Sequence, residues 1–463
     1  MEDCQKGVTP VDIRTLAGPP TTFLGHRYLL NEDTPENLLA VAREFGDLVP
    51  LHFGNRRIQR LHRLAALVTH PDDIARIFAD KTITKPYSLS ISKGQFGFGT
   101  QAVGLESDAA RETDQTRSAL DYHHLPGYFE TMLSRTESLL STWKNGDTYE
   151  MGRELMRLAL EIVGETLFSS DLTDDADTVN EALIVVMETF NKRRNYLFLV
   201  PEEFPTITNW RLRFARKRLR NIVVRILRER KASGSTKRDL VGLLLMAARQ
   251  NGQSLEQTCD QAMTYFLAGH ETTALTLCWA LIFLAQHPEI EADLHTEIET
   301  LLGEGPLTHA ALRQFKFAES IISETLRLRP PIWAMARITT QEVELRGYTI
   351  PPKTLLLLSQ FVTQRDPHWF VDPETFNPYR WNKEFRKQLP RFAYFPFGGG
   401  ERGCIGRNFA MMEALTLLVI IARKYKLQLV PGENVGRIAS LTLRPKKLLM
   451  TVNKRSVVAS LGT

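Results

Sequence analysis

The N-terminus lacks the features of a secretory signal peptide. Residues 1–20 are mostly polar, and they contain neither the basic segment nor the apolar core that such a peptide needs. We therefore expect a cytoplasmic protein in which residues 1–17 form a flexible N-terminal segment. The composition, 43% apolar and 24% charged, also excludes a disordered or collagen-like chain.

Cysteine is scarce, and the cysteines are not paired in the sequence. They are Cys4, Cys259, Cys278 and Cys404. This spacing fits neither a disulfide framework nor a CxxC pair that binds zinc or acts in redox exchange. We therefore expect a reducing compartment, and any cysteine with a chemical role must act by itself.

An excess of one charge is also missing, because the formal net charge is only +5. Nothing in it requires a nucleic-acid partner. The exception is the segment Arg211–Lys231, where ten Lys or Arg residues stand against the single acid Glu229. A solvated helix face is the ordinary interpretation. A surface for a membrane or an acidic partner is the alternative, and the apolar tract 196–201 just before it favours that alternative.

Neither an internal repeat nor a linker divides the 463 residues, although length alone would suggest about three domains. Helical periodicity dominates from residue 126 to about residue 327, and β-like runs lie on either side of it. We expect one α-dominated α+β domain that spans residues 1–463. The predicted strands are 48–53, 64–70, 342–345, 348–350, 355–358, 427–430 and 447–452, and further helices are predicted from 71 and over 408–425.

One apolar stretch, residues 262–285, is long enough to cross a membrane. It carries His270 and Glu271 in its middle, where polar and ionisable groups are costly in lipid. We interpret it as the central helix of a large protein, apolar on all sides because protein surrounds it.

Cys404 lies between a glycine-rich loop and the start of a helix. The positive end of a helix dipole favours a thiolate, and a thiolate can bind a metal. The glycines would let the backbone approach a flat ligand, and Phe397 would shield the sulfur from water. Taken by itself, a buried structural cysteine beside a glycine turn is the alternative.

The surrounding residues resemble the haem-thiolate signature FxxGxRxCxG of the cytochrome P450 family. The fixed positions are matched by Phe397, Gly400, Arg402, Cys404 and Gly406. The resemblance implies the mainly α cytochrome P450 fold with small β-sheets. It also implies that haem b lies between the long central helix and this loop, with Cys404 as the axial ligand of the iron.

A second resemblance is the ExxR motif formed by Glu324 and Arg327. On a helix this spacing brings a carboxylate and a guanidinium together, and buried apolar neighbours would require a further partner for the pair. In the family that partner comes from a PxRx motif, which here supplies Arg380. A milder departure from the family is Gln364, where many relatives carry His.

A third resemblance is Ala268–Thr273, which matches (A/G)Gx(D/E)T(T/S) in the middle of the long apolar helix. Gly269 and a backbone-bonded hydroxyl would widen the helix locally, and with Ala268 they would leave room for O₂. Thr272 and Glu271 are the expected catalytic residues, since an alcohol and an acid can deliver protons to bound oxygen. The alternative is a buried polar pair with no catalytic part.

The haem propionates need cations, and the resemblance assigns Arg402 and Arg337 to them. A third cation should come from a WxxxR motif, but residues 109–123 contain no Trp. We consider two hypotheses: compensating frameshifts in the gene or its recorded sequence, or divergence in which Arg117 or Arg111 binds the propionate. Either way, haem retention is less secure than the other motifs imply.

The resemblance implies a monooxygenase that inserts one atom of O₂ into an apolar, fatty-acid-like or terpenoid-like substrate, and it is strongest to soluble bacterial members related to fatty-acid hydroxylases. Electrons would come from a separate ferredoxin, flavodoxin or reductase, since no flavin-binding region follows residue 463. By this analogy the substrate would contact Ala268, Ala334, Met335 and Leu443, and ordinary core residues are the alternative. Near the cysteine loop, Lys387, Arg391 and Arg407 would form a basic rim on which an acidic electron donor docks, and ordinary surface charge is the alternative.

Two other functions remain open at this point. The same site could use peroxide directly, as a peroxygenase or isomerase. The unusual segment 109–123 would also fit a haem-binding protein without turnover.

Overall fold

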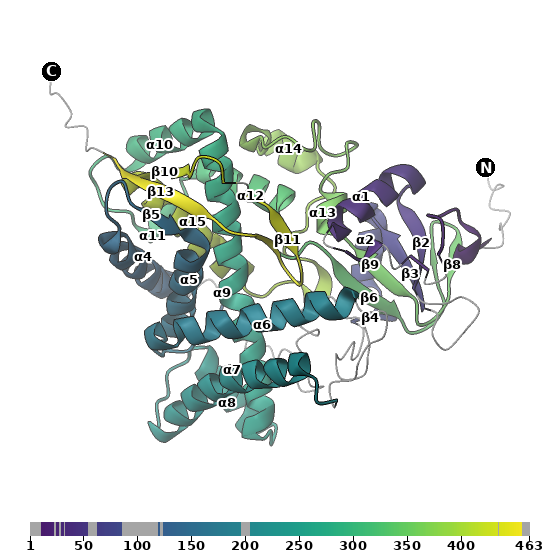
Figure 1. Cartoon of the computed structure of the whole chain (residues 1–463), viewed down its shortest axis with the longest axis horizontal. Helices are drawn as coiled ribbons and strands as arrows, with labels where there is room; N and C mark the ends of the chain where they lie inside the picture. The colour runs from purple at the N-terminus through teal and green to yellow at the C-terminus, as the bar shows by residue number, and fades with distance from the viewer. Residues whose placement is uncertain are drawn as a thin grey trace, which may run out of the picture.

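The computed structural model describes residues 11–22, 25–26, 29–31, 33–53, 63–85, 119–120, 124–195, 204–433 and 435–455. Over these residues the fold is mainly helical with small sheets, which confirms the predicted fold class (Figure 1). The helices are α1 (Thr34–Phe45), α2 (Pro71–Ala79), α4 (Leu125–Thr142), α5 (Met151–Leu167), α6 (Ala176–Asn195), α7 (Ile207–Ala232), α8 (Leu240–Gln250), α9 (Leu255–Gln286), α10 (Pro288–Leu302), α11 (His309–Leu312), α12 (Lys316–Leu328), α13 (Gln360–Thr363), α14 (Lys383–Gln388) and α15 (Arg407–Lys424).

The strands form small sheets at two ends of the molecule (Figure 1). Within the described residues the largest sheet has the order β2-β3-β9-β6-β4, with β3 and β9 parallel and the other neighbours antiparallel. A second sheet, with the strand order β10-β13-β5, lies at the opposite end. A third sheet has the order β1-β8-β7, and β11 and β12 form a hairpin. The strands are β1 (Val11–Asp12), β2 (Leu48–Phe53), β3 (Arg63–Val68), β4 (Ile83–Thr84), β5 (Thr148–Glu150), β6 (Met335–Thr339), β7 (Val343–Leu345), β8 (Tyr348–Ile350), β9 (Leu355–Leu358), β10 (Tyr425–Leu429), β11 (Arg437–Ala439), β12 (Leu443–Pro445) and β13 (Leu449–Lys454).

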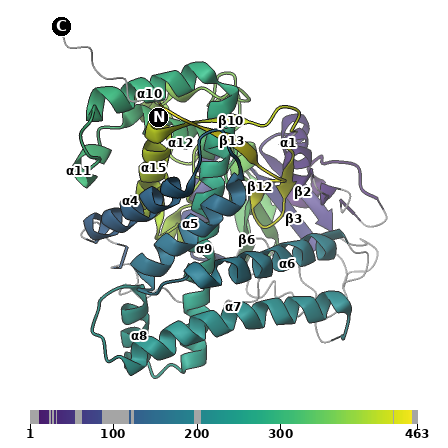
Figure 2. The ribbon, with the colours of Figure 1, turned by 60° about the vertical axis from the view of Figure 1, so that its left-hand side comes forward.

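Helix α9 is the centre of the helical region. The views in Figures 1 and 2 both show it running through that region, with α6 and α7 crossing near the half that begins at Leu255. Its most apolar stretch is long enough to span a membrane but is mostly buried inside the protein. The interpretation of residues 262–285 as a core helix is therefore confirmed, with boundaries a few residues longer than predicted.

The ends of α9 and α15 follow ordinary helix chemistry. Ser254 caps α9 through its hydroxyl, and the Gln257 side chain returns a bond to the Ser254 backbone in a capping box. Helix α15 begins directly after the Cys404 loop and is apolar on nearly all sides, because α4, α9, α10 and α12 pack around it. These two buried helices fix the walls between which the site lies.

The basic segment Arg211–Lys231 forms most of α7, and its arginines pair with acids on neighbouring elements. Arg218 bonds Glu181 of α6 at 3.1 Å, and Arg230 bonds Asp239 at the start of α8 at 2.5 Å. Further pairs are Arg211–Glu188, Arg220–Asp260 and Arg225–Asp175. Most of the ten cations are nevertheless exposed, as a solvated helix face predicts, and Arg230 is the buried exception.

The predicted flexible segment 1–17 lies partly outside the described residues. Of the part that is described, Val11 and Asp12 pair with β8, and Ile13 in the following 3-10 helix is fully buried. Residues 11–15 therefore pack on the sheet β1-β8-β7.

Candidate active site

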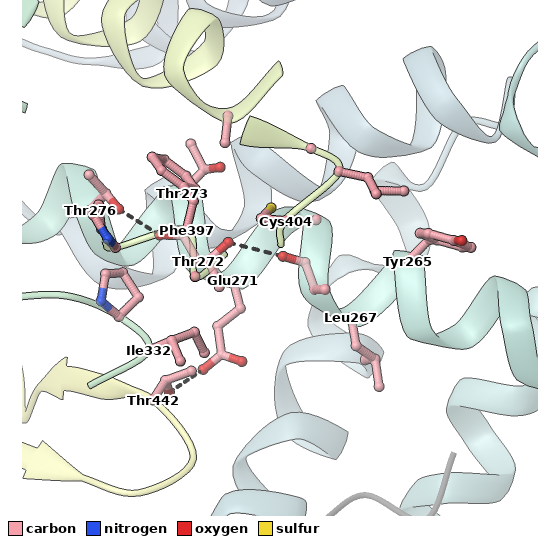
Figure 3. Close-up of a pocket in the computed structure, with 18 of the residues that line it drawn as sticks. Tyr265, Leu267, Glu271, Thr272, Thr273, Thr276, Ile332, Phe397, Cys404 and Thr442 are labelled. Atoms are coloured by element: carbon pink, nitrogen blue, oxygen red, sulfur yellow. Dashed lines mark hydrogen bonds between the residues drawn. The ribbon is translucent and has the colours of Figure 1, made fainter. Parts of the chain in front are cut away.

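A cavity of about 380 Å³ lies between α9 and the loop that precedes α15 (Figure 3). Its wall is mostly apolar and is built from α6, α9, residues 331–337, residues 396–411 and the turn 441–442. The sequence-predicted residues in this wall are Ala268, Gly269, Glu271, Thr272, Arg337, Phe397, Arg402, Cys404 and Gly406. Motifs that are more than a hundred residues apart in sequence therefore meet around a single space.

Helix α9 presents Thr272 to this cavity. The Thr272 hydroxyl donates a hydrogen bond to the carbonyl oxygen of Ala268 at 3.0 Å, one turn earlier. The local widening expected at Gly269 is not seen, since α9 is a continuous α-helix. Gly269 instead allows close packing on α5, because a Cβ there would lie 3.3 Å from Val163 Cγ2. The glycine is explained by helix packing in this structure.

Glu271 is buried, and its side chain extends toward Thr442 and away from Cys404 (Figure 3). Its Oε1 accepts a hydrogen bond of 2.8 Å from the Thr442 hydroxyl. Burial raises the pKa of Glu271, and the Thr442 hydrogen bond and the charge of Arg444 oppose that rise. The carboxyl group is therefore held with a raised pKa beside the cavity, which is typical of acids at functional sites.

His270 faces away from the cavity wall. Its Nδ1 lies 2.8 Å from the carbonyl oxygen of Phe266, and the ring is almost fully buried. Burial lowers the pKa of His270 to about 4, so the ring is neutral under ordinary conditions. Of the adjacent pair His270 and Glu271, only the acid faces the site.

The loop before α15 places Cys404 at the cavity. The Cys404 amide donates to the carbonyl oxygen of Phe397 at 2.9 Å, and both side chains line the cavity. Gly400 does not line it. Its φ is +69°, and a Cβ there would lie 2.5 Å from the carbonyl oxygen of Phe78 in α2. Gly400 is therefore needed for the loop to pack on α2, whereas Gly406 faces the cavity beside Cys404.

Arg337 and Arg402 place two cations at the same side of the cavity. Arg337 is buried, bonds the carbonyl oxygen of Ala336 at 2.9 Å and lies over the Phe78 ring. Burial, and to a smaller extent the charge of Arg402, lower the pKa of Arg337 to about 10. No carboxylate of the described residues forms an ion pair with either arginine. Two adjacent cations without an internal acid fit a ligand that carries two carboxylates, as haem does.

The ExxR glutamate sits in a fully buried network. Glu324 Oε1 accepts from Arg327, Arg380 and the Asn377 amide at 2.8 to 3.0 Å. Its Oε2 accepts from Arg327 and from the Trp381 indole, both at 2.9 Å. The partner predicted from the PxRx motif, Arg380, therefore lies on Glu324, and Trp381 is an additional partner that sequence reasoning missed.

Gln364 joins the same network, although the sequence marked it as a departure. Its amide group donates to the carbonyl oxygens of Leu326 and Arg327 and accepts from the Phe395 amide. The side chain thus bridges the end of α12 to the segment that leads into the Cys404 loop. A histidine is not needed for that bridge.

The predicted substrate contacts are met only in part. Ala268 and Met335 line the cavity, but Ala334 and Leu443 are buried elsewhere and do not. The apolar wall instead includes Leu183, Val186, Met187, Leu267, Ile332 and Leu441. The lining residues of α6 belong to no sequence motif, so their place in the cavity wall could not be predicted from the sequence.

Two further buried residues were not predicted: Thr442, which lines the cavity, and Glu413, which does not. Thr442 belongs to no motif, because its hydrogen bond to Glu271 joins two segments that only the fold brings together. Glu413 of α15 is fully buried, and neither carboxyl oxygen has a hydrogen-bond partner among the described residues. Burial raises its pKa to about 8, against a smaller lowering by the nearby Thr273 hydroxyl.

The unusual segment 109–123 lies outside the described residues, except for Ala119 and Leu120. Both of these are buried, and Leu120 lines the cavity. Arg111 and Arg117 fall outside the described residues, so both hypotheses for this segment remain predictions.

Comparison with a family model gives a match over most of the chain. The model described as Cytochrome P450 matches residues 16–453. The crystal structure of the cytochrome P450DA heme domain superposes with a TM-score of 0.81 at 25% identity, covering 96% of this chain and 98% of that one.

Three curated relatives that match most of the chain come from Streptomyces. Cyclooctat-9-en-7-ol 5-monooxygenase of Streptomyces melanosporofaciens is 32% identical over 89% of this chain and 88% of its own length. Cyclooctatin synthase of the same organism is 29% identical over 98% and 99%. Pentalenene oxygenase of Streptomyces avermitilis is 28% identical over 94% and 96%.

Proposed function

This chain belongs to the cytochrome P450 family and is a haem-dependent monooxygenase, and on that premise we propose that it oxygenates a terpenoid-like hydrocarbon. The observation that carries the proposal is the aliphatic wall around the cavity that holds Cys404 and Thr272. Such a wall binds a hydrocarbon skeleton by burial of apolar surface and offers it few polar partners. The relatives from Streptomyces, which are terpenoid oxygenases rather than fatty-acid hydroxylases, support the same substrate class.

We propose that Cys404 ligates the haem iron and that Arg337 and Arg402 bind the propionates. When bound, haem supplies the iron at which O₂ is activated for monooxygenation. Cys404 contributes the thiolate, and Phe397 lines the cavity with it and accepts a hydrogen bond from the Cys404 amide at its carbonyl oxygen. The two arginines fit the role because each presents a charge to the cavity that the described acids do not neutralise.

We propose that Thr272 and Glu271 move protons during the reaction. The Thr272 hydroxyl lies on the cavity wall, and its bond to Ala268 fixes its direction. Burial raises the pKa of Glu271, which favours the protonated form that a proton donor needs. The Glu324, Arg327 and Arg380 network has a structural role, since it ties α12 to the segment before the Cys404 loop.

The electron donor is proposed to be a separate ferredoxin, flavodoxin or reductase that docks beside the Cys404 loop. Lys387, Arg391 and Arg407 are exposed there, and a cationic rim would attract an acidic partner. We also propose a cytoplasmic location and a single domain over residues 1–463.

A substrate panel tests this function. The purified haem protein is titrated with cyclic terpene hydrocarbons or alcohols and with fatty acids of matched carbon number, following the spin-state change of the iron. We expect the terpenoids to bind and to be hydroxylated with a surrogate electron donor. Higher kcat/KM for the fatty acids would contradict the proposal.

Two variants of Ile332 test whether the substrate binds in this cavity. Ile332→Glu places a charge in the apolar wall and should weaken terpenoid binding at least tenfold, because a buried carboxylate loses its hydration. Ile332→Leu keeps the volume and should bind nearly as the parent does. Equal binding by both variants would show that the substrate does not occupy this cavity.

A further inference from the structure

We propose that Thr442, in the turn of the β11-β12 hairpin, is a positioning residue that holds the Glu271 carboxyl for proton transfer. This inference rests on the proton role proposed above for Glu271. It assigns a function to a residue outside the motifs, from a segment 171 residues away in sequence.

The contact between the two side chains is short and buried. The Thr442 hydroxyl donates to Glu271 Oε1 at 2.8 Å, and the exposed fractions are 4% for Thr442 and 5% for Glu271. Away from water, a lost hydrogen bond to a carboxylate cannot be replaced easily by solvent. Figure 3 shows both side chains meeting at the side of the cavity opposite Cys404.

The hairpin turn is held firmly enough to act as a fixed support. The Trp279 indole of α9 donates to the carbonyl oxygen of Leu443 at 3.0 Å, and the Leu443 amide donates to Pro331. The Trp333 indole donates to Ser440 at 3.0 Å. These bonds bracket Thr442 on both sides, so its hydroxyl keeps its place relative to α9.

The turn also touches the substrate space. Leu441 and Thr442 both line the cavity, and Figure 3 shows Thr442 beside Ile332. A substrate that packs on this wall therefore lies next to the bond that holds the acid. Thr442 is thus placed to keep the Glu271 carboxyl in one orientation while the cavity is filled.

The charges around Glu271 define the expected direction of change. Arg444 of β12 is the cation that acts on Glu271, and its charge and the Thr442 bond both favour the ionised carboxylate, against burial. Thr442→Val removes the hydroxyl but keeps the shape and leaves Arg444 in place. The pKa of Glu271 should then rise by about one pH unit, the size expected for one lost bond to a charged group.

The test is an infrared titration of the haem-loaded protein, following the carbonyl band of the protonated Glu271 carboxyl with pH. Glu271→Gln identifies the band by removing it. Thr442→Ser restores a hydroxyl and should return the midpoint to that of the parent. Thr136→Val is the matched control, since it removes a buried hydroxyl that bonds only the Met132 carbonyl oxygen one turn earlier in α4.

An upward shift in Thr442→Val, absent in Thr442→Ser and Thr136→Val, supports the proposal. An unshifted midpoint in Thr442→Val overturns it. The product formed per O₂ consumed is measured in parallel. If Glu271→Gln leaves that ratio unchanged, the proton role of Glu271 fails, whereas the band midpoint still decides separately whether Thr442 positions the carboxyl.

Discussion

Two buried glutamates on neighbouring helices are held in opposite ways. Glu324 of α12 accepts hydrogen bonds from two arginines, an indole and a backbone amide. Glu271 of α9 receives one hydrogen bond from the described residues, from the Thr442 hydroxyl. Both are almost fully buried, so burial alone does not distinguish them.

The number of donors explains the difference in role. A carboxylate has about four lone-pair sites, and Glu324 uses all of them to tie segments together. Glu271 leaves most of its sites unused, and burial therefore raises its pKa. A fully bonded acid stabilises the fold, whereas a sparsely bonded acid beside a cavity can exchange protons.

The largest expected effect comes from Glu324→Gln. The change leaves Arg327 and Arg380 as buried cations without their carboxylate, which should cost about 3–5 kcal/mol of unfolding free energy. Urea denaturation measures this loss. Glu299→Gln, at an exposed position of α10, is the control and should change stability by less than about 0.5 kcal/mol. A loss of unfolding free energy below about 1 kcal/mol in Glu324→Gln would show that the hydrogen bonds to Glu324 do not stabilise the fold.

Glu413 extends the comparison to a buried acid without any hydrogen bond from the described residues. Its folded pKa of about 8 lies above the unfolded value of about 4.3. The folded protein therefore keeps a proton that the unfolded chain releases, and the stabilisation present at low pH is lost as the pH rises from about 4 through about 8.

Glu413→Gln cannot ionise, so its stability relative to the parent should increase across that window. The two pKa values predict a relative advantage of about 4 kcal/mol at pH 8 that disappears toward pH 4. Urea denaturation at several pH values measures it. A constant difference at all pH values would show that Glu413 does not titrate within the window.

The smallest expected effect concerns Arg337, a buried cation in the wall of the same cavity as Glu271. Without haem, Arg337→Met should stabilise the protein by about 1 kcal/mol, because it removes a charge that burial disfavours. The same variant should release haem faster, since one propionate partner is lost. Thermal unfolding of the haem-free protein and haem transfer to an acceptor measure the two effects, and slower haem release would contradict the assignment.

Much of this protein could be predicted from short stretches of sequence. Strand 48–53 and the helix over 408–425 appear within a residue of their predicted bounds, because hydrophobic periodicity is a local property. The residues around Cys404 and the Ala268–Thr273 segment also meet at one cavity, as the motifs implied. Each of these signals is contained in a few consecutive residues.

The predictions that failed concern contacts between distant segments. Ala334 and Leu443 were expected in the cavity wall, and the structure places them in the core instead. Most cations of α7 are exposed, as a solvated face predicts, but Arg230 is buried against Asp239 and Arg218 pairs with an acid of α6. Neither result follows from a pattern within one segment.

The sequence by itself determined the family, the cysteine at the cavity and the helix that faces it, because these depend on residues close together in the chain. Only the tertiary structure decided which acids accept hydrogen bonds at nearly every oxygen site and which accept a single bond. Glu324 and Glu271 are the same residue type on buried helices, and their difference comes from donors brought in by folding: Arg380 and Trp381 to one, Thr442 to the other. Hydrogen bonds and burial act through space, and no local pattern encodes them.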